Sequence, residues 1–262
     1  MDLELTGRVA LVAAASKGLG RAVAEELAAN GARVVVCARG ESALSAAADA
    51  IRAAGGQAHG VVADVTDPAQ IHYAADEAAR VFGPVEILVT NSGGPKPGRF
   101  ETLTPEDWDA AARVLLMSAV TFTRAVLPGM RERRWGRIIN ITSIAAKQPV
   151  EGLMLSNALR AGVTGFSKTL ANEVAADGVT VNTLIPGYTR TERVVELAEH
   201  IAKTEGISPD EAEARWKREI PMGRIAEPHE FAAMAAFLAS GRASYITGQS
   251  IAVDGGWIRS LF

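Results

Sequence analysis

Ser143, Ser156 and Arg160 are polar residues of types that could together hold a polarised oxygen. Two hydroxyls can donate hydrogen bonds to a carbonyl oxygen, and a guanidinium can hold an anion or the hydroxyls of a ribose. None is a good proton donor, because a serine hydroxyl is weakly acidic and arginine stays protonated at any working pH. A reaction that develops charge on the oxygen therefore needs another acid. The candidates are Tyr188, Lys147 and Lys96, in this order, and each also suits an ordinary surface or lid position.

A glycine-containing turn near the N-terminus predicts a second component of the site. Ser16, Lys17, Gly18, Leu19 and Gly20 follow a short apolar run and open an alanine-rich helical stretch. Glycines let the backbone approach a pyrophosphate, and a helix N-terminus offers unpaired N–H groups to phosphate oxygens. The order of strand, turn, helix and second strand predicts a dinucleotide-binding unit, although such a turn can also serve only close packing of helix on strand.

The charge near this turn indicates which dinucleotide is bound. The second apolar run ends at Arg39, where an acidic residue would accept hydrogen bonds from the adenosine ribose and a basic one favours a 2′-phosphate. Arg39 and Lys17 are both basic, so NADP(H) is favoured and NAD(H) remains possible. The alternative is two ordinary surface cations.

The elements that must position these residues alternate along the chain. Short β-branched runs alternate with stretches of helical period, which is typical of repeated βαβ units and a mostly parallel sheet with helices on both faces. We expect strands at 8–13, 33–38, 57–63, 85–90, 137–142, 179–185 and 249–253. We expect helices at 18–30, 41–54, 68–82, 105–131, 155–176 and 228–239. The fold class is α/β, a Rossmann-type doubly wound sheet, and the chain 1–262 is expected to form one domain.

A charged helical insertion, about 188–220, separates the sixth expected strand from the last helix. It is either a solvated helical pair or a substrate-covering lid, because an open α/β sheet places its ligand crevice at the carboxyl ends of the strands. Trp216, Ile220 and Met222 could form its apolar underside.

The composition excludes several classes of function. A net charge of −3 and 48% apolar residues in 262 give no reason to expect nucleic acid or an anionic membrane as a partner. Four histidines and one cysteine leave little for a metal site, and Cys37, in an apolar run, is expected to be a buried small hydrophobe. The sequence shows no signal peptide and no apolar run that approaches bilayer-spanning length, so we expect a cytoplasmic protein acting on a small molecule.

Several motifs together resemble the short-chain dehydrogenase/reductase family, and within it the 3-oxoacyl-carrier-protein reductase-like members. They are Gly7-Arg8-Val9-Ala10-Leu11-Val12, Asp64-Val65-Thr66-Asp67, Thr90-Asn91-Ser92-Gly93-Gly94, Gly136-Arg137-Ile138-Ile139-Asn140-Ile141-Thr142-Ser143, Pro186-Gly187 and Val253-Asp254-Gly255-Gly256. The resemblance implies a seven-stranded doubly wound sheet, a nicotinamide dinucleotide over the strand ends and a homo-oligomer, commonly a homotetramer.

The resemblance also implies roles for individual residues. Ser143 matches a serine that binds the substrate carbonyl, and Ala14 replaces the first glycine of the turn, which is tolerable if its φ stays negative. The matched cofactor positions are Gly18, Gly20, Asp64, Val65, Asn91, Gly93, Pro186, Gly187 and Thr191. The rest of the proton machinery is changed: Ser156 stands at the tyrosine position, Arg160 at the lysine position and Leu115 at the relay asparagine position.

Three functions follow from an intact cofactor cradle beside an altered proton site. The first is an NADP(H)-dependent oxidoreductase of a small carbonyl or acyl-thioester substrate, with a substitute or water-mediated acid. The second is a catalytically silent dinucleotide-binding subunit or sensor. The third is non-redox elimination or hydration, with Ser143, Ser156 and Arg160 binding an anionic substrate. The fold does not choose among them.

Overall fold

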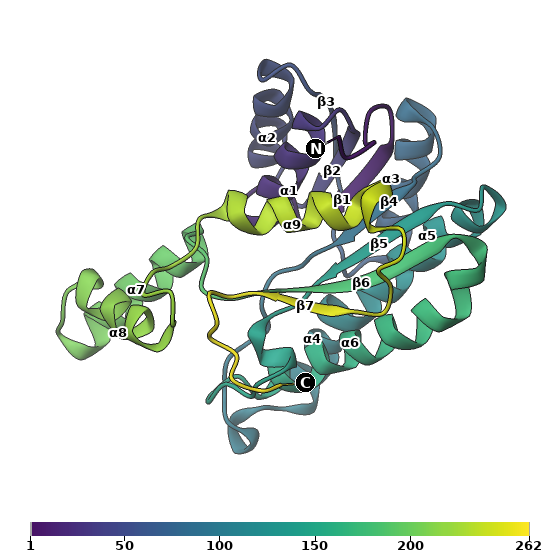
Figure 1. Ribbon diagram of the computed structural model, residues 1–262. Helices are drawn as coiled ribbons and strands as arrows, with labels where there is room; N and C mark the ends of the chain where they lie inside the picture. Colours follow the sequence, from purple (N-terminus) through teal and green to yellow (C-terminus); the bar gives the residue numbers. More distant parts are fainter. Residues whose placement is uncertain (1, 262) are drawn as a thin grey trace.

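The computed structural model describes residues 2–261; Met1 and Phe262, the ends of the predicted 1–262 range, lie outside them. Seven parallel strands form one sheet in the order β3-β2-β1-β4-β5-β6-β7 (Figure 1). The strands are β1 (Val9–Ala13), β2 (Arg33–Ala38), β3 (Gln57–Val62), β4 (Ile87–Thr90), β5 (Gly136–Ile141), β6 (Val179–Pro186) and β7 (Ser250–Val253). This confirms the predicted fold class, and every strand lies within two residues of its expected start and end.

The strands form where β-branched residues run continuously, because a parallel sheet is covered on both faces. All residues of β1, β4 and β5 are buried. One face packs against α1 (Gly18–Ala29), α2 (Glu41–Ala53) and α9 (Pro228–Ala239), and the other against α3 (Pro68–Phe82), α5 (Ser118–Glu132) and α6 (Met154–Val174). Figure 1 shows α1 and α9 in front of the sheet and α3, α5 and α6 behind it.

The helix expected at 105–131 contains an irregularity. It runs as α4 (Pro105–Ala112), a π-helical turn at Arg113–Met117 and then α5. Thr104 and Asp107 form a capping box at its start, and Pro105 occupies the first turn. π-Helical turns are rare overall, and those that occur often lie at functional sites. Leu115 lies on this one.

One expectation about this helix was wrong. The run Pro105–Glu132 is long and apolar enough, by length and composition, to cross a membrane, although no such run was expected. Its buried residues, among them Phe122 and Val126, belong to the core beneath the sheet, and α5 packs against β4, β5 and α3. Within the structure, 39% of the apolar window of this run is buried, and the core helix of a soluble protein passes the same test.

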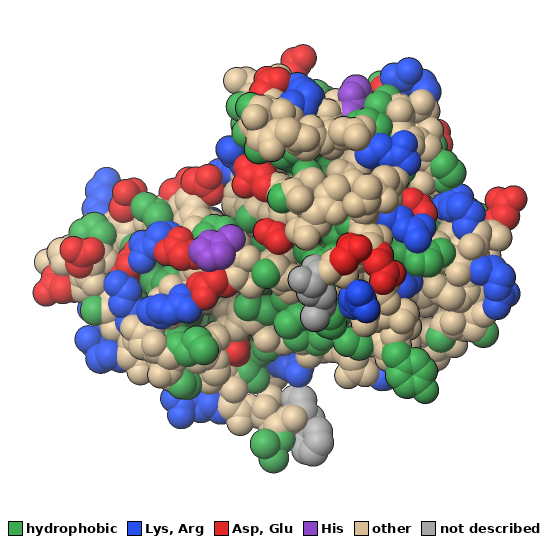
Figure 2. Space-filling view, turned by 45° about the horizontal axis from the view of Figure 1, so that its top comes forward, with side chains coloured by type: hydrophobic (Ala, Val, Ile, Leu, Met, Phe, Trp, Pro, Cys, Tyr) green, Lys and Arg blue, Asp and Glu red, His purple; other side chains and the backbone are tan. Residues whose placement is uncertain are grey.

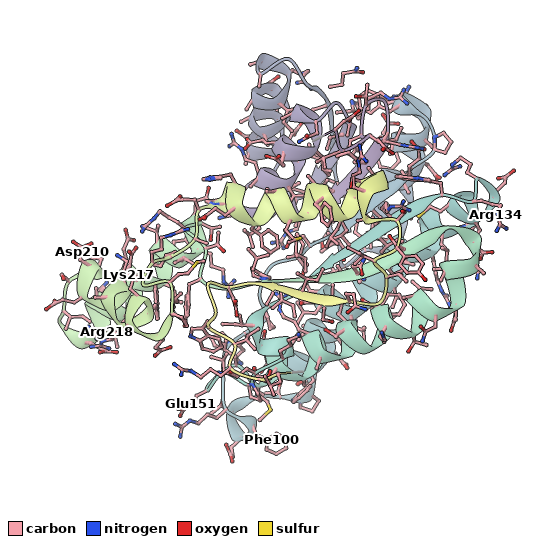
Figure 3. The ribbon with its side chains drawn as sticks, in the orientation of Figure 1. Phe100, Arg134, Glu151, Asp210, Lys217 and Arg218 are labelled. Atoms are coloured by element: carbon pink, nitrogen blue, oxygen red, sulfur yellow. The ribbon has the colours of Figure 1, made fainter. Side chains whose placement is uncertain are left out.

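The insertion after β6 forms two helices at one end of the sheet, α7 (Glu192–Glu205) and α8 (Pro209–Glu219). They lie at the left of Figure 1. Charged side chains cover this projection in Figure 2, and Asp210, Lys217 and Arg218 extend from α8 in Figure 3. Trp216 and Ile220 are buried beneath it as expected, whereas Met222 is 68% exposed. Met222 lies past the end of α8 in a turn beside Gly255, to whose carbonyl its N–H donates, and is therefore not part of the apolar underside.

Candidate active site at the carboxyl ends of the strands

The site lies where the chain direction through the sheet reverses. β1 and β4 are neighbours, but the connections that leave them run to opposite sides, which opens a crevice at their carboxyl ends. Asn91 joins the two loops, because its Nδ2 donates a hydrogen bond to the Ala14 carbonyl at 3.3 Å.

The glycine turn is built for close approach of backbone to a ligand. Gly18 has φ +59°, a conformation that favours glycine, and a β-carbon on Gly20 would lie 2.7 Å from the Ala14 carbonyl oxygen. Lys17 is the N-cap of α1, with no side-chain cap and no acidic residue in the first turn. The hydroxyl of Ser16, beside Lys17 and Leu19, contacts no described hydrogen-bonding group. The first N–H groups of α1 are thus available to an anion.

Ala14 departs from the expectation that its φ stays negative. Its φ is +48°, in the left-handed region that L-residues other than asparagine and aspartate rarely adopt. This conformation directs the Ala14 carbonyl towards Asn91 and places it close to Gly20. The turn therefore keeps the geometry suited to glycine with an alanine in the first position.

We expect Ala14→Gly to raise the free energy of unfolding by roughly 0.5–1 kcal/mol. Relief of a left-handed alanine yields about 1–2 kcal/mol, and the more flexible unfolded chain offsets about 0.4–1 kcal/mol of it. Denaturant unfolding measures the change. The matched control is Ala15→Gly, because Ala15 is fully buried and has no positive φ. Ala15→Gly should destabilise the fold, and equal effects of both substitutions would contradict strain at Ala14.

The far end of the crevice holds the charges that select a dinucleotide. Arg39 follows β2 with its side chain 80% exposed, 4.0 Å from the Asp64 carboxylate. Asp64 accepts hydrogen bonds from the Thr66 backbone and hydroxyl, both 2.8 Å, and these together with Arg39 lower the pKa of Asp64. Val65 is buried beneath this turn. The arrangement leaves Arg39 facing solvent, with one weakly held carboxylate beside it.

The segment after β6 closes over the glycine turn. Pro186 ends β6, and Gly187 is required there because a β-carbon would lie 2.6 Å from the Asp254 Cα. Thr191 then caps α7, and its Cγ2 lies 3.6 Å from where a Gly18 β-carbon would be. A β-carbon on Gly93, after β4, would meet nothing within 4 Å, so this part of the crevice is open.

The structure brings Arg160 under the end of β5. Arg160 lies on α6 and is 9% exposed, and its Nη1 donates to the Thr142 carbonyl at 2.8 Å and weakly to Ile141 at 3.5 Å. Burial, and secondly the positive charge of Arg193, lower the pKa of Arg160 to about 10. The guanidinium is therefore still protonated at neutral pH and does not supply a proton.

The two serines lie on elements that pack against each other, Ser143 at the start of the 3₁₀ turn Ile144–Ala146 and Ser156 on α6. Ser143 ends the β5 loop as N-cap of a short 3₁₀ turn, its Oγ accepting from the Ala145 N–H at 3.3 Å. Ser156 lies on the first turn of α6, one turn before Arg160, and is 6% exposed. No described residue forms a hydrogen bond with the Ser156 hydroxyl. Both hydroxyls can donate to an oxygen that enters the crevice.

Leu115 and Arg160 line one small cavity. Its volume is about 10 Å³, close to the minimum for one water, and Thr90, Asn91 and Ser118 contribute to its walls. The Arg160 Nε and the neighbouring Thr142 hydroxyl are buried without a described hydrogen-bond partner. Since buried polar groups nearly always form hydrogen bonds, these two groups are available to a bound molecule or to water.

The candidate acids lie in different surroundings. The Tyr188 ring stacks on Trp216, with centroids 5.0 Å apart, and burial and then Glu219 raise the pKa of its phenol. It lines a pocket of about 420 Å³ with residues around Met222 and Asp254, whereas Arg160 lines the small cavity. Lys96 forms an ion pair with Asp107 at 2.8 Å. Lys147 is half-buried after Ser143, and no described acidic residue pairs with its ammonium group.

Two site residues escaped the sequence reasoning. Asn157 fixes the loop before α6, because its side chain accepts from the Val150 N–H at 3.1 Å and donates to the Val150 carbonyl at 2.9 Å. Arg193, in the first turn of α7, extends over Gly94. Asn157 carried a signal, since it lies between Ser156 and Arg160. Arg193 carried none, because its direction depends on where α7 begins.

The sole cysteine is confirmed as a core residue. Cys37 is buried in β2, and burial raises the pKa of its thiol to about 12, although a hydrogen bond from the Ala14 backbone acts in the opposite direction. A thiol of this kind is inert as a nucleophile.

These residues fit a dinucleotide. The uncapped α1 suits a pyrophosphate, Arg39 suits a charged group on the adenosine ribose, and the unpartnered Arg160 Nε suits a polar group at the other end. A crevice of this kind at the switch point of a doubly wound sheet defines a dinucleotide-binding protein of the Rossmann type.

Comparison with known proteins identifies the family. Residues 13–258 match the family model described as enoyl-(acyl carrier protein) reductase. The chain is 38% identical over 254 residues to the 3-oxoacyl-(acyl carrier protein) reductase FabG of Vibrio cholerae, covering 97% of this chain and 98% of that protein. It is 40% identical to the monensin polyketide synthase putative ketoacyl reductase of Streptomyces virginiae over 253 residues, 96% of this chain and 97% of that one.

A solved structure agrees with these relatives. The L-sorbose reductase of Gluconobacter frateurii, complexed with NADPH and L-sorbose, superposes with a TM-score of 0.96 at 34% identity, covering 100% of both chains. The chain belongs to the short-chain dehydrogenase/reductase family, and the predicted resemblance is confirmed.

Proposed function

We propose that this protein is an NADP(H)-dependent oxidoreductase that interconverts a small carbonyl compound and its alcohol. The observation that carries this proposal is the arrangement, at the carboxyl ends of the strands, of the exposed Arg39, the uncapped N-terminus of α1 and the buried Arg160 with its unpartnered Nε. The relative from Gluconobacter frateurii is a reductase complexed with NADPH, and the Vibrio cholerae relative is named for a 3-oxoacyl thioester substrate. Both support reduction of a carbonyl or acyl-thioester substrate.

The roles of the residues follow from their chemistry. When bound, the dinucleotide supplies a hydride to the carbonyl carbon. Ser143 and Ser156 donate hydrogen bonds to the carbonyl oxygen, which stabilises the negative charge that develops there. Arg160 holds the ribose hydroxyls with its fixed donors, and Lys17 and Arg39 bind the 2′-phosphate. Asn91, Gly93, Pro186, Gly187 and Thr191 shape the crevice, with Asp64 and Val65 beside the adenine.

The proton that completes the alcohol comes, we infer, from water. Ser156, which is 6% exposed, carries a weakly acidic hydroxyl that is much shorter than a phenol and has no described hydrogen-bond partner. Tyr188 belongs to the aromatic cluster of the lid, and Lys96 is held by Asp107. The reaction then proceeds by positioning and hydride proximity without the usual contribution of a fixed acid, which is about 10²-fold to 10⁴-fold.

The proton source is tested with Tyr188→Phe and Lys147→Met. We expect either variant to keep kcat/KM within about threefold, since a true general acid contributes about 10²-fold or more. The measurement is the pH profile of kcat/KM for carbonyl reduction, together with the melting temperature of each variant. A loss of 10²-fold in a variant that melts normally would assign the donor to that residue and overturn the proposal of water.

The helical pair α7 and α8 is proposed as the lid of this site, because Thr191 at its start lies over Gly18. A homo-oligomer, a tetramer by analogy with the family, is also proposed. It is supported by apolar side chains exposed on the long helix, among them Met117 at 48%, and by β7, which pairs only with β6 among the described strands. The location proposed is the cytoplasm, in keeping with a single cysteine and a diffusible substrate.

The function is tested by following NADPH absorbance with a panel of ketones, oxo acids and 3-oxoacyl thioesters, beside thermal unfolding with and without NADPH. Oxidation of NADPH with formation of the alcohol supports the proposal. Thermal protection by NADPH with no oxidation across the panel would make the protein a silent dinucleotide-binding subunit. Conversion of a substrate with unchanged absorbance would indicate elimination or hydration instead.

A further inference from the structure

Arg193 is a charged group in the crevice that the function described so far does not use. It lies in the first turn of α7, and a β-carbon on Gly94 would be 2.7 Å from its Cζ and 2.7 Å from its Nη1. Glycine at position 94 therefore makes the space that the guanidinium fills. Arg193 is exposed, and its guanidinium lies over Gly94 in the loop after β4.

The first turn of α7 presents different groups to the two ends of the crevice. Thr191 and Glu192 lie against the glycine turn, within 3.8 Å of where a Gly18 β-carbon would be. Arg193 points instead to Gly94 and acts electrostatically on Arg160. The guanidinium thus lies at Gly94, close enough to Arg160 to act on its charge, and not at the pyrophosphate turn.

Among the described residues, Arg193 forms no ion pair with a carboxylate. Nearby Arg190 shows the contrast, since it pairs with Glu213 at 3.0 Å and Glu227 at 3.4 Å. Arg160, buried and also without a carboxylate, adds a second positive charge, and its Nε has no acceptor. Two like charges at one end of a crevice repel each other unless an anion lies between or beside them.

We propose that Arg193 binds the carboxylate of the substrate, so that the protein prefers small oxo acids over neutral carbonyl compounds. This inference rests on the proposed carbonyl reduction. A planar guanidinium binds a carboxylate through two parallel hydrogen bonds, and the fixed charge of Arg160 strengthens the attraction for an anion. Because Arg193 lies in the first turn of α7, the helical pair then determines this specificity.

The test compares an oxo acid with its methyl ester, pyruvate with methyl pyruvate and acetoacetate with methyl acetoacetate, in wild type, Arg193→Met and Arg193→Lys. We expect wild type to favour the acid, and Arg193→Met to lose about 10-fold to 100-fold of the acid-to-ester ratio of kcat/KM, as for a hydrogen-bonded charge pair. Arg193→Lys should keep part of the ratio, and the Kd of NADPH should stay within about twofold. The control is Arg215→Met, which removes an exposed arginine paired with Glu205 elsewhere on the lid.

A binding measurement separates this inference from the proposed function. Calorimetry with oxamate, an unreactive oxo-acid analogue, on the NADPH-loaded protein reports the carboxylate site even if no substrate turns over. Turnover of the esters with an acid-to-ester ratio that Arg193→Met does not change would overturn the inference and leave the function standing. If Arg193→Met instead raised the Kd of NADPH tenfold and left the acid-to-ester ratio of kcat/KM unchanged, Arg193 would be assigned to the cofactor phosphates. That result would also overturn the inference.

Discussion

Replacing Ser156 by tyrosine together with Arg160 by lysine is expected to raise kcat/KM for carbonyl reduction by about 10²-fold to 10⁴-fold, the contribution of a positioned general acid. The two positions lie one turn apart on the same face of α6, at the start of the helix. A phenol at position 156 can reach the oxygen that Ser143 binds, and a lysine beneath it lowers the pKa of the phenol by its positive charge. The gain is measured as NADPH oxidation with one fixed ketone.

The single variants and a size-matched control make this result specific. Ser156→Tyr alone should recover part of the gain, because Arg160 is also a cation, whereas Arg160→Lys alone should recover none. Ser156→Phe with Arg160→Lys adds nearly the same bulk without the hydroxyl. Equal rates in the tyrosine and phenylalanine doubles, with normal melting temperatures, would mean that the substrate oxygen is not held near Ser143.

Leu115 is the next position to change in the double variant. It lies on the π-helical turn, where the family carries its relay asparagine. A leucine side chain cannot hold a water by hydrogen bonds, but the cavity beside it also contains the polar groups of Thr90 and Ser118. If proton exchange with solvent limits the restored enzyme, adding Leu115→Asn to the double variant is the next step in the series. Because Leu115 is unchanged in the double variant, the gain of that variant is expected in single-turnover measurements, before proton exchange with solvent limits the rate.

The sheet could be predicted closely from the sequence, because its signal is local. β2 and α9 begin and end as expected, since a β-branched run between Ala32 and Arg39 and a proline-started alanine-rich helix leave few other choices. The place of the cofactor turn was also predictable, because position relative to strand and helix defines it. The switch point then follows from the parallel order of the strands.

The details that sequence reasoning missed depend on backbone angles and on helix phase. Ala14 gives no sign of its positive φ, because alanine rarely adopts it and the surrounding contacts with Asn91 and Gly20 impose it. Arg193 and Arg190 are three residues apart, yet one forms ion pairs within the lid and the other extends across the crevice. Only the start of α7 at Glu192 determines this difference.

At the proton site, the residues could be predicted from the sequence, but their surroundings could not. Ser156 and Arg160 could be located by their distance from Ser143. That Arg160 is buried against the Thr142 carbonyl, and that Tyr188 is stacked on Trp216, required the packing of α6 and α8. Long-range packing, unlike local period, is not encoded within one segment.

Replacing both Lys17 and Arg39 by alanine is expected to weaken NADPH binding by at least about 10²-fold and to leave the Kd of NADH within about threefold. Each hydrogen bond between a charged side chain and a phosphate contributes roughly 1.5–3 kcal/mol, and a tenfold change in Kd is about 1.4 kcal/mol. Asp64 adds to the effect, because its lowered pKa keeps it ionised and loss of Arg39 leaves its charge facing the 2′-phosphate.

Calorimetric titration with each nucleotide at one fixed ionic strength measures the two affinities, and repeating it at higher salt should shrink the difference for NADPH. The control is Arg80→Ala with Lys203→Ala, the same loss of charge on α3 and α7; Arg80 is exposed and, among the described residues, pairs with Glu77. If the affinities for NADPH and NADH fell equally in the Lys17 and Arg39 variant, these cations would bind the pyrophosphate that both nucleotides share. In that outcome the choice between NADP(H) and NAD(H) would have to come from elsewhere in the crevice.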